Sequence, residues 1–180
     1  LPVQVGITLS YSIEGERYEL TSSAGATLYR RTALSWDDSE KIAAFVTPNE
    51  EVVAQFSHRV ASTALSSGEL GRKYRLGGKF LRGIALFDAV GTYGIEYIED
   101  PSSPITRVLE NADAVDTVRF PRTTLYYRSG DCDDSTALLC SLFESAGIAT
   151  AIMTSPGHVF FAYDTGEPVS NRWQFETDDL

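Results

Sequence analysis

One cysteine lies where the sequence predicts the start of a helix. Cys132 follows Gly130 and Asp131, and an aspartate in the capping position places the thiol in the first helical turn. A helix N-terminus carries unpaired N–H groups and a partial positive charge, so it favours a thiolate and can hold a nearby oxyanion. Cys132 is therefore a candidate nucleophile.

A base and an acid follow the cysteine in the chain. His158 begins one predicted strand, and Glu176 lies on the next, 172–177. Antiparallel pairing of these strands would place the two Cβ atoms about 5 Å apart. Asp164 is excluded because the length of strand between it and His158 is about 20 Å. Cys132, His158 and Glu176 are thus a candidate triad, in which a one-residue change of register would turn Glu176 away.

The chain of 180 residues is acidic. Fifteen Lys and Arg against 25 Asp and Glu give a formal net charge of −10, and no basic run offers a track for phosphates, so we expect no nucleic-acid partner. We also expect no membrane insertion, because no apolar stretch approaches the roughly 20 residues of a span. The chain begins with Leu1 rather than Met, which indicates a processed or excised chain.

The two cysteines are not expected to form a disulfide. Cys132 and Cys140 lie on one predicted helix about 12 Å apart, which is too far for an S–S bond. Cys140 stands among leucines and is predicted to be a buried apolar residue.

We expect no metal and no cofactor. Asp131, Asp133 and Asp134 could supply oxygen ligands to Ca²⁺, but they lack the spacing of a calcium-binding loop. Zinc has only His58 and His158 available, and His58 is predicted to be a surface or packed residue within a helix.

The hydrophobic pattern predicts an α+β fold in a single domain, 1–180. Residues 1–35 are expected to form an N-terminal hairpin or small sheet, 36–94 a helical part, and 95–180 the catalytic core. The glycine-rich, basic stretch Gly68–Gly78 is predicted to be a mobile loop, with anion or acidic-partner binding as the alternative.

The expected elements follow in chain order. They are strands near 3–13, 17–21 and 26–33, helices from 36 to before Pro48, from Asn49 and over 80–91, an extended stretch 95–98, a helical turn 105–110, an irregular stretch 120–125, the helix from Cys132 to Gly147, and strands 148–154, 158–163 and 172–177.

The segment from about Tyr97 to Thr177 resembles the transglutaminase-like superfamily of papain-type cysteine enzymes, and its bacterial members most closely. The resemblance rests on Gly130-Asp131-Cys132-Asp133-Asp134, the helix exit Ala146-Gly147-Ile148, Pro156-Gly157-His158 and Trp173-Gln174-Phe175-Glu176-Thr177. It implies a papain-like core in which the cysteine helix packs against an antiparallel sheet that carries the histidine and the acid. It also implies a periplasmic or envelope-associated parent protein.

The resemblance assigns an oxyanion donor and shows two departures. Tyr97 is the implied donor upstream of the cysteine, with Tyr126 and Tyr127 as alternatives. Glu176 stands where the family usually has aspartate, and the chain ends four residues later.

These residues predict cysteine-dependent acyl transfer or hydrolysis at amide bonds of peptides or proteins, through a thioester. An amine acceptor gives transfer and crosslinking, whereas water gives hydrolysis, as in a cysteine peptidase. The negative charges beside the thiol oppose a thiolate, so His158 must pair with Cys132 to activate it. The alternative from another class is a catalytically inactive binding module of a larger envelope or assembly protein.

Overall fold

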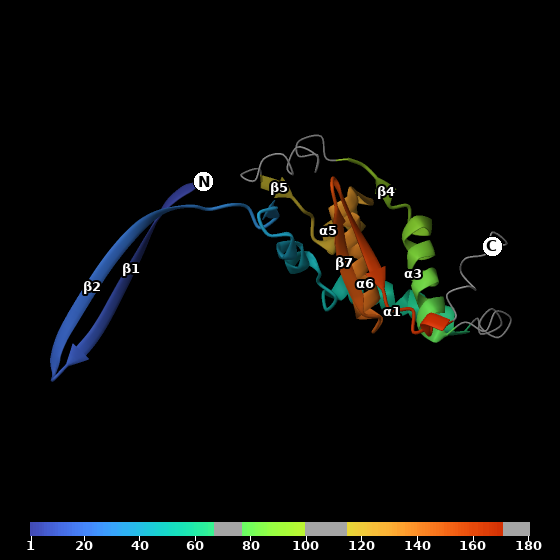
Figure 1. The fold of residues 1–180 in the computed structure, drawn as a ribbon, viewed down its shortest axis with the longest axis horizontal. Helices are drawn as coiled ribbons and strands as arrows, with labels where there is room; N and C mark the ends of the chain where they lie inside the picture. The colour runs from blue at the N-terminus through green and yellow to red at the C-terminus, as the bar shows by residue number, and fades with distance from the viewer. Residues whose placement is uncertain (67–76, 100–114, 171–180) are drawn as a thin grey trace. The chain divides into compact units, whose positions relative to one another are not determined.

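The computed structural model describes residues 1–66, 77–99 and 115–170. It is a mixed α+β structure of two compact units, Leu1–Ala33 and Leu34–Leu180 (Figure 1). The boundary between the units falls close to residue 35, where the N-terminal extension is predicted to end.

The first unit is a single antiparallel hairpin of two long strands. Strand β1, Pro2–Ile13, pairs with β2, Glu16–Thr27, along its full length. Glu14 and Gly15 form the turn with φ values of 50° and 88°, the left-handed conformation that a two-residue hairpin turn of type I′ requires at both positions. The hairpin is therefore confirmed.

The prediction of two separate strands at 17–21 and 26–33 is wrong. One continuous strand, β2, runs to Thr27 instead. The small residues Ser22 to Gly25 have little intrinsic strand preference, but each lies opposite a residue of β1 in the ladder. Pairing with the partner strand thus overrides local propensity.

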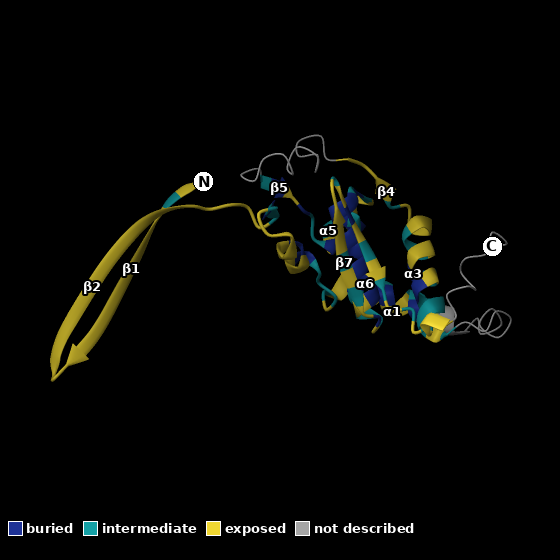
Figure 2. Cartoon of the chain, viewed as in Figure 1, coloured by how far each residue is buried: buried dark blue, intermediate teal, exposed yellow. Residues whose placement is uncertain are grey.

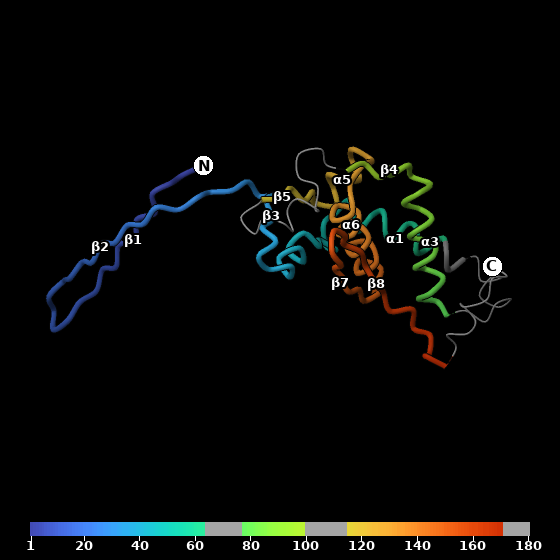
Figure 3. The backbone as a smooth tube through the Cα atoms, turned by 45° about the horizontal axis from the view of Figure 1, so that its top comes forward, coloured from blue at the N-terminus to red at the C-terminus, as the bar shows by residue number. Residues whose placement is uncertain are grey.

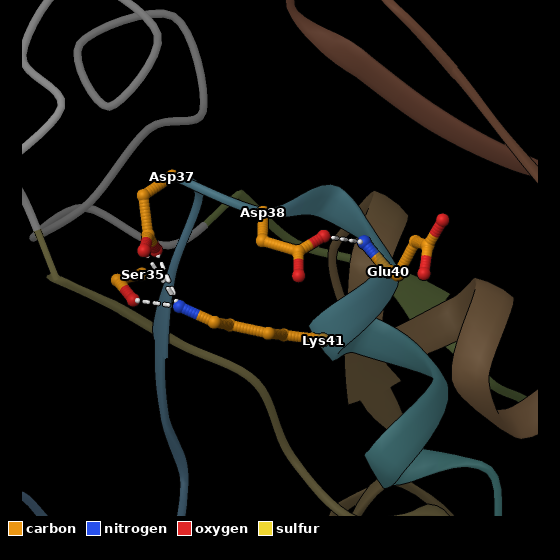
Figure 4. Close-up of polar contacts among 5 residues, drawn as sticks. All are labelled: Ser35, Asp37, Asp38, Glu40 and Lys41. Atoms are coloured by element: carbon orange, nitrogen blue, oxygen red, sulfur yellow. Dashed lines mark hydrogen bonds and ion pairs between the residues drawn. The ribbon is translucent and has the colours of Figure 1, made fainter.

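The second unit begins with a short strand and a 3₁₀ helix. Strand β3, Ala33–Ser35, precedes η1, Ser39–Phe45, whose N-cap Asp38 accepts a hydrogen bond from the Glu40 N–H at 2.9 Å. Figure 4 shows the Lys41 ammonium beside both carboxylate oxygens of Asp37, at 2.6 and 2.8 Å. These local contacts fix the start of the predicted first helix.

Three helices enclose the main apolar cluster. They are α1, Glu51–Ser66, α3, Gly78–Tyr93, and α6, Cys132–Ser145. The cluster consists of Val53, Leu86, Leu125, Leu138, Leu139, Leu142, Phe143 and Ile148. Figure 2 shows buried residues gathered on α6, which is the central helix of this unit. The predicted helical part and the predicted core therefore share one interior.

The helix boundaries largely follow the local signals. Helix α1 begins at Glu51, two residues after the predicted start at Asn49. Helix α3 ends at Tyr93, and the φ of 85° at its C-cap, Gly94, lets the Gly94 N–H reach the carbonyls of Gly91 and Val90. After α6, Gly147 takes a φ of 74° and ends the helix as predicted.

The stretch predicted to be irregular around 120–125 is in fact a helix. Helix α5 spans Pro121–Tyr127 and has the proline in its first turn, where the missing N–H costs nothing. Neighbouring Thr123 and Thr124 lower the intrinsic helix propensity, so the pattern did not indicate this helix.

Within the described ranges, each strand pairs with one other strand. Besides the hairpin there are three pairs. Strand β3 pairs with β5 (Val115–Thr117), and β4 (Glu96–Tyr97) pairs in parallel with β6 (Ser129–Gly130). Strand β7 (Thr150–Ser155) pairs antiparallel with β8 (His158–Tyr163). Figure 3 shows β7 and β8 side by side. Both strands match their predictions to within two residues.

Several expectations lie outside the described residues. They are the strand 172–177 with Glu176, the helical turn 105–110 and most of the loop 68–78. None of the helices in the described ranges is both long and apolar enough to cross a bilayer.

Candidate catalytic cysteine site

The cysteine begins a capped helix, as the sequence predicts. Asp131 lies in extended conformation at the N-cap of α6, and its carboxylate accepts a hydrogen bond from the Asp134 N–H at 3.4 Å. Cys132 is the first helical residue and is 7% exposed. Cys140, eight residues later on the same helix, is also buried. Both thiols are free.

Gly130 allows the chain to enter the helix closely. A Cβ at this position would lie 2.6 Å from the Cβ of Asp134 and 3.2 Å from Cγ2 of Thr124. Real Cβ atoms essentially never lie as close as 2.6 Å to another Cβ, so the backbone of β6 passes the first turn of α6 only because residue 130 is glycine. The glycine thus sets the position of the cysteine.

Asp134 ties this turn to the segment before α5. Its carboxylate accepts the Arg119 backbone N–H at 2.6 Å, and the Arg119 guanidinium lies 3.6 Å away while donating to the Ser129 carbonyl. Burial raises the pKa of Asp134 to about 6, against the lowering effect of the Arg119 contacts. Asp134 is therefore a structural residue of the helix start.

Asp133 is buried in its neutral form. It is 1% exposed, and burial, a hydrogen bond to Asp131 and the charges of Asp131, Asp116 and Asp134 raise its pKa to about 10. At neutral pH it is a carboxylic acid that donates a hydrogen bond to Asp131. Asp116, also buried, accepts a hydrogen bond from the Trp36 indole at 2.9 Å.

The same surroundings disfavour a thiolate at Cys132. Burial raises the pKa of the Cys132 thiol, and the carboxyl groups of Asp133 and Asp131 raise it further. The hydrogen bond from the Val159 backbone N–H lowers the pKa more than either carboxyl group raises it, and one from the Asp133 N–H lowers it slightly, but burial is the largest influence. The resting state is thus a thiol.

Strand β8 meets the first turn of α6 through one residue, Val159. Its backbone N–H donates to the sulfur of Cys132, and its carbonyl accepts from the Thr136 hydroxyl at 3.3 Å. Ser155 and His158 close the β7–β8 turn, so the alternating ladder points the backbone groups of Val159 away from β7. The sulfur lies at this strand edge.

His158 is one peptide unit from that contact. It is exposed, and its ring stacks on Phe160 with centroids 6.0 Å apart and planes 19° apart. The alternate residues Val159, Phe161 and Tyr163 include the two rings that pack on Phe143 of α6. Among the described residues, the imidazole makes no hydrogen bond, to Cys132 or to any other group.

Tyr97 lies on β4, next to the strand that leads into the cysteine helix. It pairs with Gly130 in the parallel β4–β6 ladder and is 59% exposed. Partial burial raises the pKa of its hydroxyl, and the charge that Cys132 would carry as a thiolate raises it further. The alternatives Tyr126 and Tyr127 are exposed at the end of α5 and pack on each other.

The remaining sequence candidates lie elsewhere. Glu176 is outside the described residues. His58 is exposed on α1, with Nε2 3.1 Å from the Ser145 carbonyl oxygen, as expected of a surface histidine. Asp164 forms an ion pair with Lys79 at 2.5 Å.

An apolar cavity of about 320 Å³ lies between α3, α6 and β8. It is lined by Phe87, Phe143, Phe161 and their neighbours, and its lining includes neither Cys132 nor His158.

The acidic residues could approach a cation but are already engaged. Carboxylate oxygens of Asp131, Asp133 and Asp134 all lie within 4.8 Å of one another. Asp134 accepts from the Arg119 N–H, and Asp133 holds a proton. The hydrogen bonds of Asp131, Asp133 and Asp134 account for the positions of the three carboxyl groups.

Sequence reasoning missed the backbone donor of Val159 and the roles of Asp116 and Arg119. A backbone N–H leaves no mark in sequence, and Asp116 and Arg119 stand outside any pattern. Comparisons of the chain with protein-family models, with characterised proteins and with solved structures give no match.

Proposed function

We propose that this chain is a cysteine-dependent acyltransferase or hydrolase of the transglutaminase-like type, which acts on amide bonds of peptides or proteins. The observation that carries the proposal is the position of Cys132: its sulfur lies at a capped helix start and accepts the N–H next to His158. Tyr97 pairs with Gly130, two residues before the cysteine, in the β4–β6 ladder.

The chemistry is nucleophilic acyl transfer. His158 takes the proton of the Cys132 thiol as the sulfur attacks the carbonyl carbon, and the Tyr97 hydroxyl and helix N–H groups hold the oxyanion. Collapse of the tetrahedral intermediate breaks the C–N bond, and His158 returns its proton to the leaving amine. Water or a second amine then cleaves the thioester.

The resting geometry requires one rearrangement before attack. The imidazole must turn from Phe160 around the strand edge toward the sulfur. An aromatic contact of this kind is worth about 0.5–1.5 kcal/mol, which is the part of the cost that comes from leaving Phe160. Because Cys132 rests as a thiol, proton removal belongs to the reaction step. Glu176 is the proposed residue that orients the imidazole.

Intact-mass spectrometry with an activated ester tests the proposal. Wild type should gain one acyl group, Cys132→Ala should gain none, and Cys140 remains in that variant as an internal thiol control. His158→Gln should slow acylation by about 10²–10⁴-fold, as expected for loss of a general base, whereas His58→Gln should not. Equal labelling of wild type and Cys132→Ala contradicts the proposal.

The second candidate is a catalytically inactive module that binds a partner. Three observations favour it: Cys132 is 7% exposed, its pKa is raised, and the imidazole rests on Phe160. A glutamine peptide with and without an amine separates the outcomes. Transfer leaves the amine on the peptide, hydrolysis leaves glutamate, and an inactive module leaves the peptide unchanged and forms no adduct with the ester.

A further inference from the structure

The hairpin of the first unit presents one apolar face and one polar face. Cross-strand pairs on the apolar face are Val3–Ala26, Val5–Ala24, Ile7–Ser22, Leu9–Leu20 and Tyr11–Tyr18. Pairs on the other face are Gln4–Gly25, Gly6–Ser23, Thr8–Thr21, Ser10–Glu19 and Ser12–Arg17. Apart from the half-buried Val3, the large apolar side chains of this face are between 37% and 67% exposed, and Figure 2 shows nearly all of both strands as exposed.

We expect another apolar surface to cover this face of the hairpin. A two-stranded hairpin is marginally stable alone, and contiguous exposed apolar surface of this size marks an interaction site. Strand β1 and β2 each have 12 residues, so the face is about 40 Å long. The covering surface must be long, apolar and flat.

The shape of the face matches an inverted copy of itself. Side chains are small at the open end, where Ala24 and Ala26 lie opposite valines, and large near the turn, where Tyr11 and Tyr18 stack with centroids 5.4 Å apart. Two such faces packed head to tail place each thick end over a thin end. That arrangement keeps a uniform spacing near the roughly 10 Å of stacked sheets.

The charges at the two ends also match. Glu16 lies opposite Ile13 on the apolar face, at the turn end. At the open end, pairing extends to Leu28, whose N–H donates to the Leu1 carbonyl, and Arg30 follows two residues later. An inverted copy therefore places the Glu16 carboxylate of one chain near Arg30 of the other, and the reverse, as a two-fold interface requires.

We propose that the apolar faces of two β1–β2 hairpins stack in inverted orientation, so that a second copy of this chain is the partner. The interface is a four-stranded sandwich with two Glu16–Arg30 contacts related by the two-fold axis. It is independent of the acyl-transfer proposal, since none of its residues belongs to the cysteine site.

Sedimentation velocity of the full chain over a dilution series tests the stacking. Wild type should show a monomer–dimer equilibrium. Leu9→Lys, on the apolar face, should raise the dissociation constant by about tenfold or more, because it leaves an unpaired charge in the interface. Thr8→Lys, the same change one residue earlier on the polar face, should leave it unaltered. A monomeric wild type, or a dimer indifferent to Leu9→Lys, overturns the proposal.

Charge reversal tests the orientation and does not depend on a core substitution. Glu16→Lys and Arg30→Glu should each weaken the dimer, and the double variant should restore it, because each reversed residue then meets its reversed partner. Failure of the double variant to recover affinity overturns the inverted stacking. Circular dichroism of each variant shows that the hairpin is intact.

Discussion

The sulfur of Cys132 accepts a hydrogen bond from the backbone N–H of Val159, and this contact joins the start of α6 to the edge of β8. Thr136, one turn further along the helix, donates to the carbonyl of the same residue. Both edge groups of Val159 are therefore engaged by one helix turn. His158, the proposed base, precedes Val159 in the chain, so its backbone adjoins this contact while its imidazole stacks on Phe160.

The first prediction concerns the reactivity of the resting thiol. Because burial and the neighbouring carboxyl groups raise the pKa of Cys132, alkylation by iodoacetamide should reach its half-maximal rate at a pH above that of a free cysteine. Peptide mass mapping over a range of pH values measures this rate. Asp131→Asn retains a capping side chain and removes a charge, so it should shift the profile to lower pH.

A midpoint at or below that of a free thiol in the folded wild type would contradict a resting thiol. The same measurement in denaturant is the control, since unfolding removes the burial and should return the midpoint to the usual range near about 8.5. Cys140, buried in the same helix, should also react more slowly in the folded chain than in denaturant.

The second prediction assigns the oxyanion donor. Tyr97→Phe keeps the ring and removes the hydroxyl, so it should lower kcat by about 10²–10³-fold with little change in KM, as loss of one oxyanion donor does elsewhere. Tyr126→Phe is the matched control, because Tyr126 lies exposed at the end of α5. Equal effects of the two substitutions on acylation would remove Tyr97 from the mechanism.

Elements with a strong periodic signal could be predicted from sequence. Helix α6 begins at Cys132 and strand β8 at His158, as expected from the cap Asp131 and from the turn formed by Pro156 and Gly157. In these segments the local signal and the tertiary packing agree. Local chemistry therefore positions the proposed nucleophile and base.

Other features depend on contacts that sequence does not reveal. Helix α5 contains two threonines of modest propensity and is stabilised by packing of Leu125 in the main apolar cluster. The length of β2 depends on its partner strand. The protonation of Asp133 arises from burial beside Asp131 and Asp116, which only the folded chain brings together. The role of Glu176 stays a prediction.

The third prediction concerns pH and stability. The pKa of Asp133 rises from 3.8 in the unfolded chain to about 10 in the folded one, so between these values the folded chain binds the extra proton. Its stability should then fall as pH rises, by up to about 1.4 kcal/mol for each pH unit. Asp133→Asn removes this titration while keeping an oxygen to accept the Asp134 N–H at 2.6 Å.

Urea unfolding of wild type and Asp133→Asn at several pH values checks the sign. The variant should gain stability relative to wild type, and the gain should grow from pH 5 to pH 8. Asp164→Asn is the control, and it should lose stability rather than gain it, because the contact with Lys79 lowers the pKa of that exposed carboxyl. A gain for Asp133→Asn that is constant with pH would mean that Asp133 is not protonated in the folded chain.

The fourth prediction concerns the entry to the cysteine helix. Gly130→Ala places a Cβ 2.6 Å from the Cβ of Asp134, which is held by the Arg119 N–H and cannot move aside freely. The variant should lose about 1–3 kcal/mol of stability, the usual cost of overpacking. It should also lose acylation activity, since the shift displaces the first turn of α6 and with it the sulfur.

Gly91→Ala provides the matched comparison within the same unit. Gly91 lies inside α3, and a Cβ there meets no atom within 4 Å, so alanine should stabilise the helix by about 0.5–1 kcal/mol. Urea unfolding measures both variants against wild type. If Gly130→Ala proved as stable and as active as Gly91→Ala, the close passage of β6 past Asp134 would not be what fixes Cys132 beside Val159.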